Sequence, residues 1–411
     1  MDYPRINRRQ AGAALLLMML ALIVFIGALF VVSSDDAEKN RIGRREQTVR
    51  VLAKAKEALL AHALIDAIST PQLTPRPGEL PCPDSNGDGK SDAGGCADSI
   101  GWLPWVTLEL EDLRDASGNR LWYAVSEDFQ DDGGSEPKIN SGNITTGQFR
   151  ILDAMGTELD RAAALIIAPE EPLSGQTRFA AETDLGAVIQ NYLENENNNL
   201  NDSYTNEITP GLNDQLMVIT VDNIIQRVAA LAVREAAVAL QNYYDDKDFY
   251  PYAESDAAAS CDAGTAGAAY NIGFLPIQID AGCAYGEDLT DYGLPDWIVT
   301  QEWYKHVLAI VAEPCTYSSN PADLNCNKAG TLLSLDGNGG IRAMVVHIGP
   351  QLSNITCDTK SNYNQNRAGG IYDDVCNYLE TAENTDGDDD PDYIQSAASA
   401  TVNDVFLIVS P

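Results

Sequence analysis

An acidic loop about one fifth of the way along the chain has the ligand spacing of a metal site. Its four oxygen-bearing side chains stand at positions 1, 3, 5 and 9, namely Asp84, Asn86, Asp88 and Asp92. Gly89 at position 6 permits the sharp turn that points such ligands inward in calcium-binding loops. Position 12 is Gly95 instead of the Glu that completes the pattern. The loop predicts either a structural Ca²⁺ site or an acidic turn held by Asx hydrogen bonds.

A second acidic segment near the C-terminal end has similar chemistry. It carries carboxylates at alternate positions, namely Asp386, Asp388, Asp390 and Asp392. These residues predict either a second Ca²⁺ site or a solvated run of charge. Residues 195–202 hold the equivalent place in the first half and are mostly amides, so we expect weaker or no binding there. Asp336-Gly337 is typical of a hairpin turn.

All eight cysteines fall into four pairs of sequence neighbours. The pairs are Cys82 with Cys96, Cys261 with Cys283, Cys315 with Cys326, and Cys357 with Cys376. An even count with local spacing and no CxxC motif favours disulfides over a zinc site. Because disulfides persist in oxidising compartments, we expect the bulk of the chain in the periplasm or in an extracellular assembly.

Signatures of catalysis are missing from this sequence. His62 lies in a helical pattern, and His306 and His347 lie in apolar strand patterns, where a structural imidazole is expected. No GxSxG, HExxH, Walker or dinucleotide-binding motif occurs. The formal net charge of -35 argues against a nucleic-acid partner, because phosphate binding needs clustered Lys and Arg. We therefore expect a protein without enzymatic activity.

The chain begins with an element that would tether all of these residues to a membrane. This element is an apolar run of 22 residues, Ala11–Val32. A helix of this length spans roughly 30 Å, which is enough to cross a bilayer. Arg5, Arg8 and Arg9 precede the run and predict a cytoplasmic N-terminus. The run therefore predicts a protein that crosses a membrane once, with the rest of the chain on one side. A cleaved secretory signal is the alternative, although the run is long for one.

The chain after this run contains the same series of motifs twice. Each half begins with an Ala- and Leu-rich helical pattern, from Arg50 and from Arg227, and we expect Asp222 to be the N-cap of the second helix. The matched segments that follow are Gly101-Trp-Leu-Pro and Gly273-Phe-Leu-Pro, 121–125 and 303–310, 165–169 and 345–350, 191–194 and 377–380, and 213–220 and 403–410. Six matches in one order indicate an internal repeat.

This repeat predicts the fold class. The helical pattern and the apolar strand patterns in each half favour two tandem α+β domains, each a helix packed on an antiparallel sheet. Four aromatic residues of the first half are expected to anchor the core, namely Trp102, Trp105, Trp122 and Tyr123.

The start of the apolar run, Arg8-Arg-Gln-Ala-Gly12-Ala-Ala-Leu-Leu-Leu, resembles the N-terminus of the type IV pilin-like family, which includes the pseudopilins of type II secretion. The resemblance covers the first ~130 residues. It implies that a prepilin peptidase cuts after Gly12 and leaves Ala13 as the first mature residue. The fifth mature position is Leu17, where the family usually has Glu. In lacking this Glu the chain resembles the large minor pseudopilin that caps a filament tip.

With this resemblance, the expected fold class is α+β, with a long N-terminal transmembrane helix followed by two tandem pilin-like domains. The expected boundaries are 1–12 for the leader peptide, 13–32 for the transmembrane part of a helix that reaches about residue 68, 33–221 for the first domain and 222–411 for the second.

The expected function is that of a non-enzymatic minor pilin or pseudopilin, anchored in the inner membrane and assembled into, or capping, a type IV pilus or type II secretion filament. Its expected partners are other pilins or pseudopilins through the N-terminal helix, the inner membrane and the prepilin peptidase. The alternative is an uncleaved, membrane-anchored periplasmic or surface binding protein, similar to an adhesin, with duplicated domains. Only the pilin route removes the first twelve residues.

Overall fold

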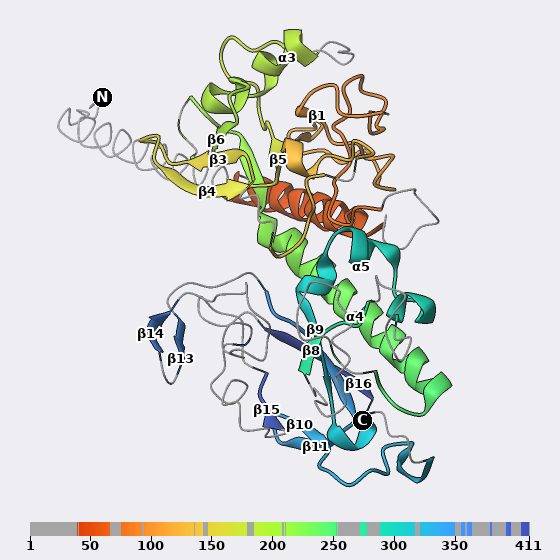
Figure 1. Ribbon diagram of the computed structural model, residues 1–411. Helices are drawn as coiled ribbons and strands as arrows, with labels where there is room; N and C mark the ends of the chain where they lie inside the picture. The colour runs from red at the N-terminus through yellow and green to blue at the C-terminus, as the bar shows by residue number, and fades with distance from the viewer. Residues whose placement is uncertain are drawn as a thin grey trace, which may run out of the picture.

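Figure 1 shows the protein, in a computed structural model. The structure describes Lys39 and residues 41–65, 75–92, 94–134, 136–142, 147–178, 185–207, 209, 211–251, 253, 272–277, 288–316, 321–349, 355–357, 360–363, 379, 392–395 and 404–410. These residues form two four-stranded sheets, two three-stranded sheets and a two-stranded ribbon, together with several helices.

The first four-stranded sheet is built from the apolar motifs of the first half and is wholly antiparallel. Its strands in spatial order are β1 (Ile100–Trp102), β2 (Trp122–Val125), β5 (Ala164–Ala168) and β7 (Gln215–Ile219). Every residue of β1, β2 and β5 is buried, which accounts for their continuous apolar sequences. Trp102, Trp122 and Tyr123 are buried in this sheet, as predicted, whereas Trp105, which was also expected to anchor the core, is only partly buried.

A helix over residues 41–62 packs on one face of the first sheet. Its buried side chains Leu52, Ala55 and Leu59 recur at helical spacing and belong to the same hydrophobic core as Tyr123. The Lys56 ammonium donates a hydrogen bond of 2.8 Å to the Val218 carbonyl of strand β7. The helix therefore contacts both a face and an edge of the sheet.

A smaller layer covers the opposite face of the first sheet. Strands β3 (Phe149–Leu152), β4 (Glu158–Ala162) and β6 (Ser203–Thr205) form a sheet in the order β4-β3-β6, in which β3 is antiparallel to β4 and parallel to β6. Helix α3 (Leu185–Tyr192) lies in the same layer. Side chains of this layer pack against the residues of β2 and β5 that point to this face of the sheet. Together they form a second, separate hydrophobic core.

The second four-stranded sheet has the same strand order and is also wholly antiparallel. Its strands are β8 (Ile272–Phe274), β9 (Val307–Val311), β12 (Ala343–His347) and β16 (Val405–Ser410). Each strand overlaps the motif that the repeat matches to the corresponding strand of the first sheet. Strand β9 begins later than predicted, because Trp303–Lys305 form a 3-10 helix.

A second three-stranded sheet also repeats the first. Strands β10 (Leu333–Leu335), β11 (Asn338–Ile341) and β15 (Asp392–Tyr393) lie in the order β11-β10-β15, with β10 antiparallel to β11 and parallel to β15. Asp336 and Gly337 join β10 to β11 with φ angles of 53° and 75°, as a type I′ turn requires. The predicted hairpin is confirmed.

The remaining short elements connect these sheets. Strands β13 (Ile355–Cys357) and β14 (Lys360–Tyr363) form the antiparallel ribbon. The other short helices are α5 (Asp296–Thr300) and 3-10 helices at Glu127–Phe129, Asn195–Asn198, Leu289–Tyr292, Glu313–Cys315 and Pro321–Asp323.

The long helix α4 (Val221–Lys247) joins the two halves (Figure 1). Thr220, and not the predicted Asp222, is its N-cap: the Thr220 hydroxyl accepts from the Asn223 amide, and the Asn223 side chain accepts from the Thr220 amide. The helix packs on strands β9, β12 and β16 of the second sheet. Its N-terminal part contacts the helix over residues 41–62, where the Lys56 ammonium lies 2.7 Å from Asn223 Oδ1.

A second set of contacts between the halves lies near residue 140. The indole nitrogen of Trp303 donates to the Ile139 carbonyl at 2.9 Å, and Asn140 Nδ2 donates to the Gln301 carbonyl at 2.7 Å. Lys138 forms an ion pair with Glu302. One hydrophobic core extends through residues of both halves.

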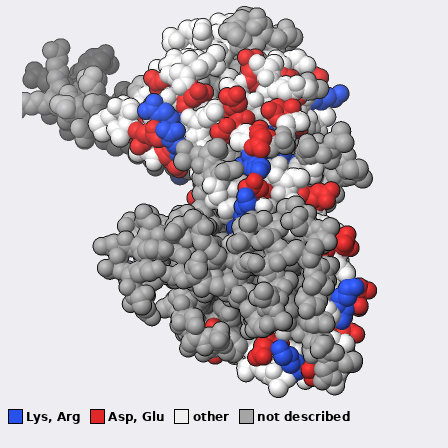
Figure 2. Space-filling model, viewed as in Figure 1, with Lys and Arg blue, Asp and Glu red and all other residues white. Residues whose placement is uncertain are grey.

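Asp and Glu side chains are spread over the described surface, with Lys and Arg among them (Figure 2). Several of the basic side chains form ion pairs, such as Lys54 with Glu111 at 2.7 Å. Such exposed pairs add little to stability.

The fold class predicted from the sequence is therefore wrong as stated. The described residues form an α+β fold, but none of their helices is both long and apolar enough to cross a membrane. The longest, α4, carries Arg227, Arg234 and Glu235 along its length. The predicted span, residues 13–32, lies outside the described residues. Each half also contains a second, smaller sheet, and α4 contacts both halves, so neither half is simply one helix packed on one sheet.

Candidate functional site

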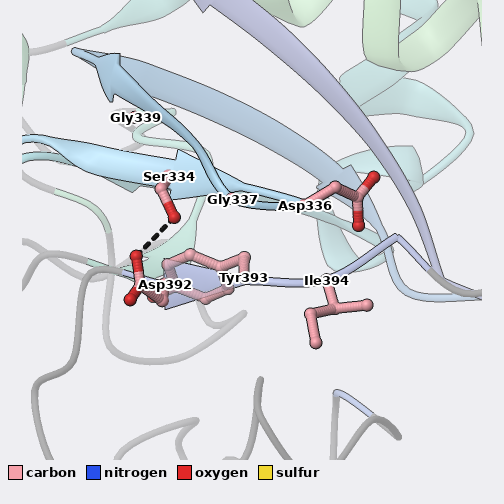
Figure 3. A pocket seen from close by; sticks show the side chains of 7 residues that line it. All are labelled: Ser334, Asp336, Gly337, Gly339, Asp392, Tyr393 and Ile394. Carbon is pink, nitrogen blue, oxygen red and sulfur yellow. Dashed lines mark hydrogen bonds between the residues drawn. The ribbon is translucent and has the colours of Figure 1, made fainter.

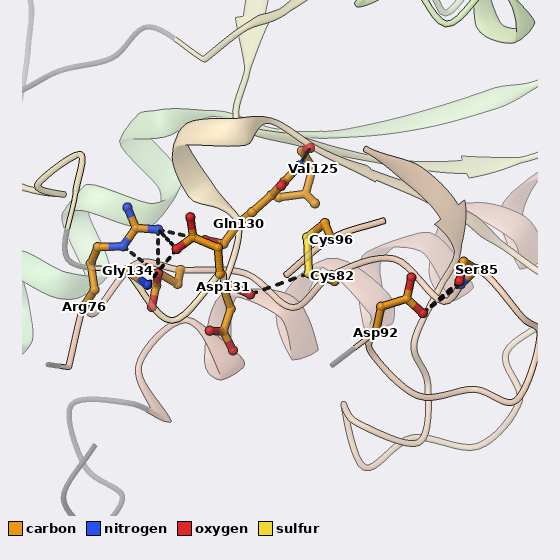
Figure 4. Close-up of a disulfide and its surroundings, with 11 residues drawn as sticks. Arg76, Cys82, Ser85, Asp92, Cys96, Val125, Gln130, Asp131 and Gly134 are labelled. Atoms are coloured by element: carbon orange, nitrogen blue, oxygen red, sulfur yellow. Dashed lines mark hydrogen bonds and ion pairs between the residues drawn. A yellow bond between two sulfur atoms is a disulfide. The ribbon is translucent and has the colours of Figure 1, made fainter. Parts of the chain in front are cut away.

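The acidic loop predicted to bind calcium lies between strand β1 and an isolated bridge that pairs Leu80 with Gln130. A disulfide between Cys82 and Cys96 closes it (Figure 4). Cys82 is buried, and its sulfur lies 3.6 Å from the Asp131 carbonyl. The disulfide thus joins the two ends of the loop, and cross-links of this kind stabilise a loop by restricting the unfolded chain.

Asp84 organises the loop from inside. The residue is only 1% exposed, and its Oδ1 accepts from the amides of Asn86 and Gly87 at 3.1 and 2.6 Å. Its Oδ2 accepts from the Gly89 amide at 2.7 Å. Burial raises the pKa of Asp84 above its ordinary value, while these amide hydrogen bonds oppose the rise. Asp84 therefore holds the turn as a hydrogen-bond acceptor.

Gly89 is required by this geometry. Its φ angle is 83°, in the region that side chains other than Gly rarely adopt. A Cβ atom at this position would lie 2.6 Å from the Trp105 ring. The Gly that calcium loops carry at position 6 is thus needed here for the turn itself.

The other predicted ligands of the first loop form local turns. Asn86 Oδ1 accepts from the Asp88 amide at 2.9 Å, and Asp88 Oδ1 accepts from the Lys90 amide at 2.8 Å. Asp92 Oδ1 accepts from the Ser85 hydroxyl at 2.9 Å (Figure 4). The bonds of Asn86 and Asp88 are the Asx hydrogen bonds of the alternative interpretation, whereas the Asp92–Ser85 bond joins two side chains seven residues apart.

The two interpretations of this loop are compatible in chemistry. A carboxylate oxygen has two acceptor sites, so a side chain that accepts one amide retains capacity for a cation. Asn86 and Asp88 are also exposed. However, no three His, Cys, Asp or Glu side chains converge as a metal site would need within the described part of the chain. The Ca²⁺ site therefore stays a prediction.

The second acidic segment is described only at its end. Asp386, Asp388 and Asp390 lie outside the described residues, whereas Asp392 lies on strand β15 and accepts a hydrogen bond from the Ser334 hydroxyl. Asp392 borders an open pocket of about 540 Å³ whose other lining residues are Ser334, Asp336, Gly337, Gly339, Tyr393 and Ile394 (Figure 3). Asp336 accepts from the Gln395 amide at 3.0 Å. The structure thus places Asp336 and Asp392 in one pocket, which the sequence did not indicate.

The remaining predicted site residues are described in part. The structure contains a disulfide between Cys315 and Cys326. Cys261, Cys283 and Cys376 lie outside the described residues, and Cys357 ends strand β13. The expected cleavage site at Gly12 and Ala13, like Leu17, also lies outside them.

Sequence reasoning missed a buried pair of side chains between the two halves. Ser141 Oγ lies 2.6 Å from His347 Nε2, and both residues are buried. His347 lies on strand β12 as expected, and Trp303 packs against its ring with 5.8 Å between the ring centroids. The imidazole thus has a structural hydrogen bond, in agreement with the role expected for it. Nothing near Ser141 in the sequence indicates a partner 206 residues away.

A buried arginine beside the first disulfide was also missed. The Arg76 guanidinium is fully buried and donates to the Gln130 carbonyl at 2.7 Å (Figure 4). It also donates to Glu79 and to the Pro137 carbonyl, the latter at 2.9 Å. It joins the segment before the acidic loop to the segment that reaches the second half. A buried charge that is paired and hydrogen-bonded in this way is costly to disrupt.

Comparison with known proteins identified no relative of this chain. No protein-family model matches the chain, and neither a curated protein nor a solved structure matches it.

Proposed function

We propose that this protein is a non-enzymatic subunit of a pilin-like assembly, a minor pilin or pseudopilin that is tethered to the bacterial inner membrane and incorporated into, or caps, a type IV pilus or type II secretion filament. The proposal rests on the order of elements at the N-terminal end of the chain. A basic segment, a Gly, and an apolar run of 22 residues are followed by a helix whose buried face packs on an antiparallel sheet.

The helix over residues 41–62 supports this proposal through the side that it leaves free. Ile42 and Val49, seven residues apart, are 49% and 48% exposed. Residues at this spacing lie on one face of a helix. An exposed apolar stripe next to a longer apolar run can pack against similar helices of neighbouring subunits. The proposed partners at this stripe are other pilins or pseudopilins.

The disulfides support a location outside the cytoplasm. Two of them are present among the described residues, and disulfides are rare in reducing compartments. We propose that the described residues lie in the periplasm or in an extracellular filament, on the side of the membrane opposite the basic N-terminus.

The processing of the N-terminus tests the proposal. The full-length protein is expressed with and without an active prepilin peptidase, and its intact mass and N-terminal sequence are measured. We expect an N-terminus at Ala13 only when the peptidase is active, and a Gly12→Val variant should remain uncleaved. An intact Met1 in the presence of active peptidase would contradict a pilin-like role. The alternative function, an uncleaved binding protein with duplicated domains, would then be favoured.

We also propose that the loop from Asp84 to Asp92 is a structural Ca²⁺ site. The support is the spacing of its oxygen ligands and its closure by a disulfide. Calorimetric titration of the full-length protein with Ca²⁺ should show binding that Asp88→Ala removes, whereas Asp153→Ala, in another exposed Asx turn, should bind as the wild type does. No heat and no change of thermal stability with Ca²⁺ would contradict the site.

A further inference from the structure

Two buried carboxyl groups, those of Glu194 and Asp214, lie in one hydrogen-bond network beneath the layer that contains helix α3: the Glu194 amide donates to Asp214, and the Asn213 amide donates to Glu194. Asp214 is fully buried and Glu194 is 7% exposed. Glu194 follows α3, and Asp214 directly precedes strand β7, so the two groups connect the outer layer to the edge of the first sheet. Two adjacent buried carboxylates repel each other and cannot both stay ionised without a compensating charge.

The hydrogen-bond donors around this pair are unevenly distributed. Glu194 Oε1 accepts from Gln176 Nε2 at 2.7 Å, and Glu194 Oε2 accepts from the Asn213 amide at 3.1 Å. Asp214 Oδ2 accepts from the Glu194 amide at 3.1 Å and from Asn197 Nδ2 at 2.9 Å. Asp214 Oδ1 is buried and alone among the four carboxyl oxygens has no partner within the described residues.

One charged group opposes the two carboxyls. Arg178 lies 3.9 Å from Glu194 Oε1, and its guanidinium also donates to the carbonyls of Pro169, Asn191 and Tyr192. Asp115 and Tyr192 also act electrostatically on Arg178, as Glu194 and Asp214 do. One arginine can balance one carboxylate, and a second positive charge or a proton is then needed for the other.

We propose that Asp214 is a protonated carboxylic acid whose Oδ1 carries a hydrogen that it donates to the Glu194 carboxylate. This acid–carboxylate pair forms a pH-sensitive latch, which holds the α3 layer on the first sheet while the proton is present and weakens when it is lost. The donor pattern selects Asp214 as the site of the proton, because both oxygens of Glu194 already accept hydrogen bonds. A hydrogen on Oδ1 would satisfy the one atom of the pair that has no donor.

The electrostatic surroundings act in the same direction. Burial raises the pKa of Asp214 well above its ordinary value, and the negative charge of Glu194 adds to the rise. The folded state therefore binds a proton that the unfolded state releases above about pH 4. Folding stability from this group is fully present below that pH and declines as the pH rises toward the folded-state pKa.

The repeat places the same residue types in the second half. Asn377-Tyr-Leu-Glu380 and Asn403-Asp404 correspond to Asn191-Tyr-Leu-Glu194 and Asn213-Asp214. Asp404 is buried directly before strand β16, as Asp214 is before β7. Both residues of the latch therefore belong to motifs that occur in each half. The proposal itself rests on the described pair in the first half.

The variant Asp214→Asn tests the proposal, because the amide of the introduced side chain can donate permanently where the acid donates only when protonated. We measure thermal unfolding of the full-length protein across about pH 4 to pH 9, with the exposed Asp160→Asn as the matched control. The Asp214→Asn protein should gain about 2–4 °C at neutral pH, and its advantage should grow with pH. Glu194→Gln should be destabilised at all pH values, because it places an amide donor against an existing donor.

Infrared spectroscopy of the wild-type protein provides a readout that does not depend on any variant folding. A carbonyl stretch of a protonated carboxyl should be present at neutral pH, and Asp214→Asn should remove it. Absence of this band in the wild type would overturn the proposal, as would an Asp214→Asn protein that fails to fold. A wild-type midpoint that rises with added Ca²⁺, without the infrared band, would assign Asp214 Oδ1 to a cation and would equally overturn it.

Discussion

The two helices that begin the two halves, residues 41–62 and α4, come from matched sequences but differ in their surroundings. The first helix buries one face on the first sheet and exposes Ile42 and Val49. Helix α4 buries side chains around most of its circumference, from Val221 to Tyr244, because it contacts both halves. The comparison teaches that a repeated helix can become an internal support in one copy and remain a one-sided surface helix in the other.

The largest effect is expected from a charge in α4. Ala232→Asp would bury an unpaired carboxylate at a position with no exposure, and we expect a loss of more than about 4 kcal/mol and no cooperative folding of either half. Ala53→Asp, at an exposed position of the first helix, is the control and should fold normally. Circular dichroism during thermal unfolding measures both. A cooperative transition of Ala232→Asp near that of the wild type would break the comparison.

A matched pair of cavities would sharpen the comparison. Leu59→Ala and Leu240→Ala both remove a fully buried side chain and should each cost about 2–5 kcal/mol. Hydrogen exchange should show that Leu240→Ala lowers protection mainly in β9, β12 and β16, because α4 packs on these strands. Leu59→Ala should lower protection mainly in β2 and β5. Equal effects of the two variants on β9 and β12 would contradict distinct roles for the helices.

The contact near residue 140 should be the next in size. Ser141→Ala removes the hydrogen bond to His347 between the halves, at a cost of about 1–3 kcal/mol. Ser174→Ala, at an exposed turn, is the matched control and should be neutral. Denaturant titration measures both variants. If Ser141→Ala were also neutral, α4 and the apolar core would be sufficient to join the halves.

A smaller, pH-dependent effect is expected at the end of the first helix. Burial lowers the pKa of His62 below its ordinary value of 6.5, and the opposing effect of Asp131 is the lesser one. The folded state keeps this imidazole neutral, so stability should fall as the pH drops below about 6.5, where the unfolded state takes up a proton. His62→Gln should reduce this slope in thermal unfolding measured against pH. An unchanged slope would show that other groups cause it.

The smallest effect on stability is expected at the exposed stripe of the first helix. Val49→Ser should change the free energy of unfolding by no more than about 0.5 kcal/mol. If the stripe contacts neighbouring subunits, the same variant should reduce incorporation into filaments, measured by co-purification of the subunits. A variant that assembles as the wild type does would leave the exposed face without that role.

The apolar strands were the most predictable part of the fold. Runs such as Leu165-Ile-Ile-Ala were recognised because a fully buried strand has a nearly continuous apolar sequence. The start of β9 was misplaced because Trp303 also looks like a strand residue, and only its hydrogen bond to Ile139, far away in the sequence, favours a 3-10 helix. The cap of α4 was misplaced by two residues for a similar reason, since both Thr220 and Asp222 are good N-cap residues.

The smaller sheets and the buried polar pairs were not predictable. Strand β6 has three residues and pairs in parallel with β3, about fifty residues earlier, so no local pattern marks it. In the candidate site, the spacing from Asp84 to Asp92 predicted the loop but could not distinguish a cation site from Asx turns, because both need the same oxygens. Ser141 stands in no recognisable motif, and the repeated motif that contains Asp214 does not indicate that this residue lies beside Glu194, so only the fold shows what surrounds them.

The position of α4 limits how far the two copies remain separate modules. Ile224 and Val228 are fully buried in the core that extends through both halves. A chain cut before Val221 would leave the first copy with an uncovered apolar surface, and the second copy would begin with a helix exposed on one side. Because one helix now serves both halves, we expect that neither half folds on its own.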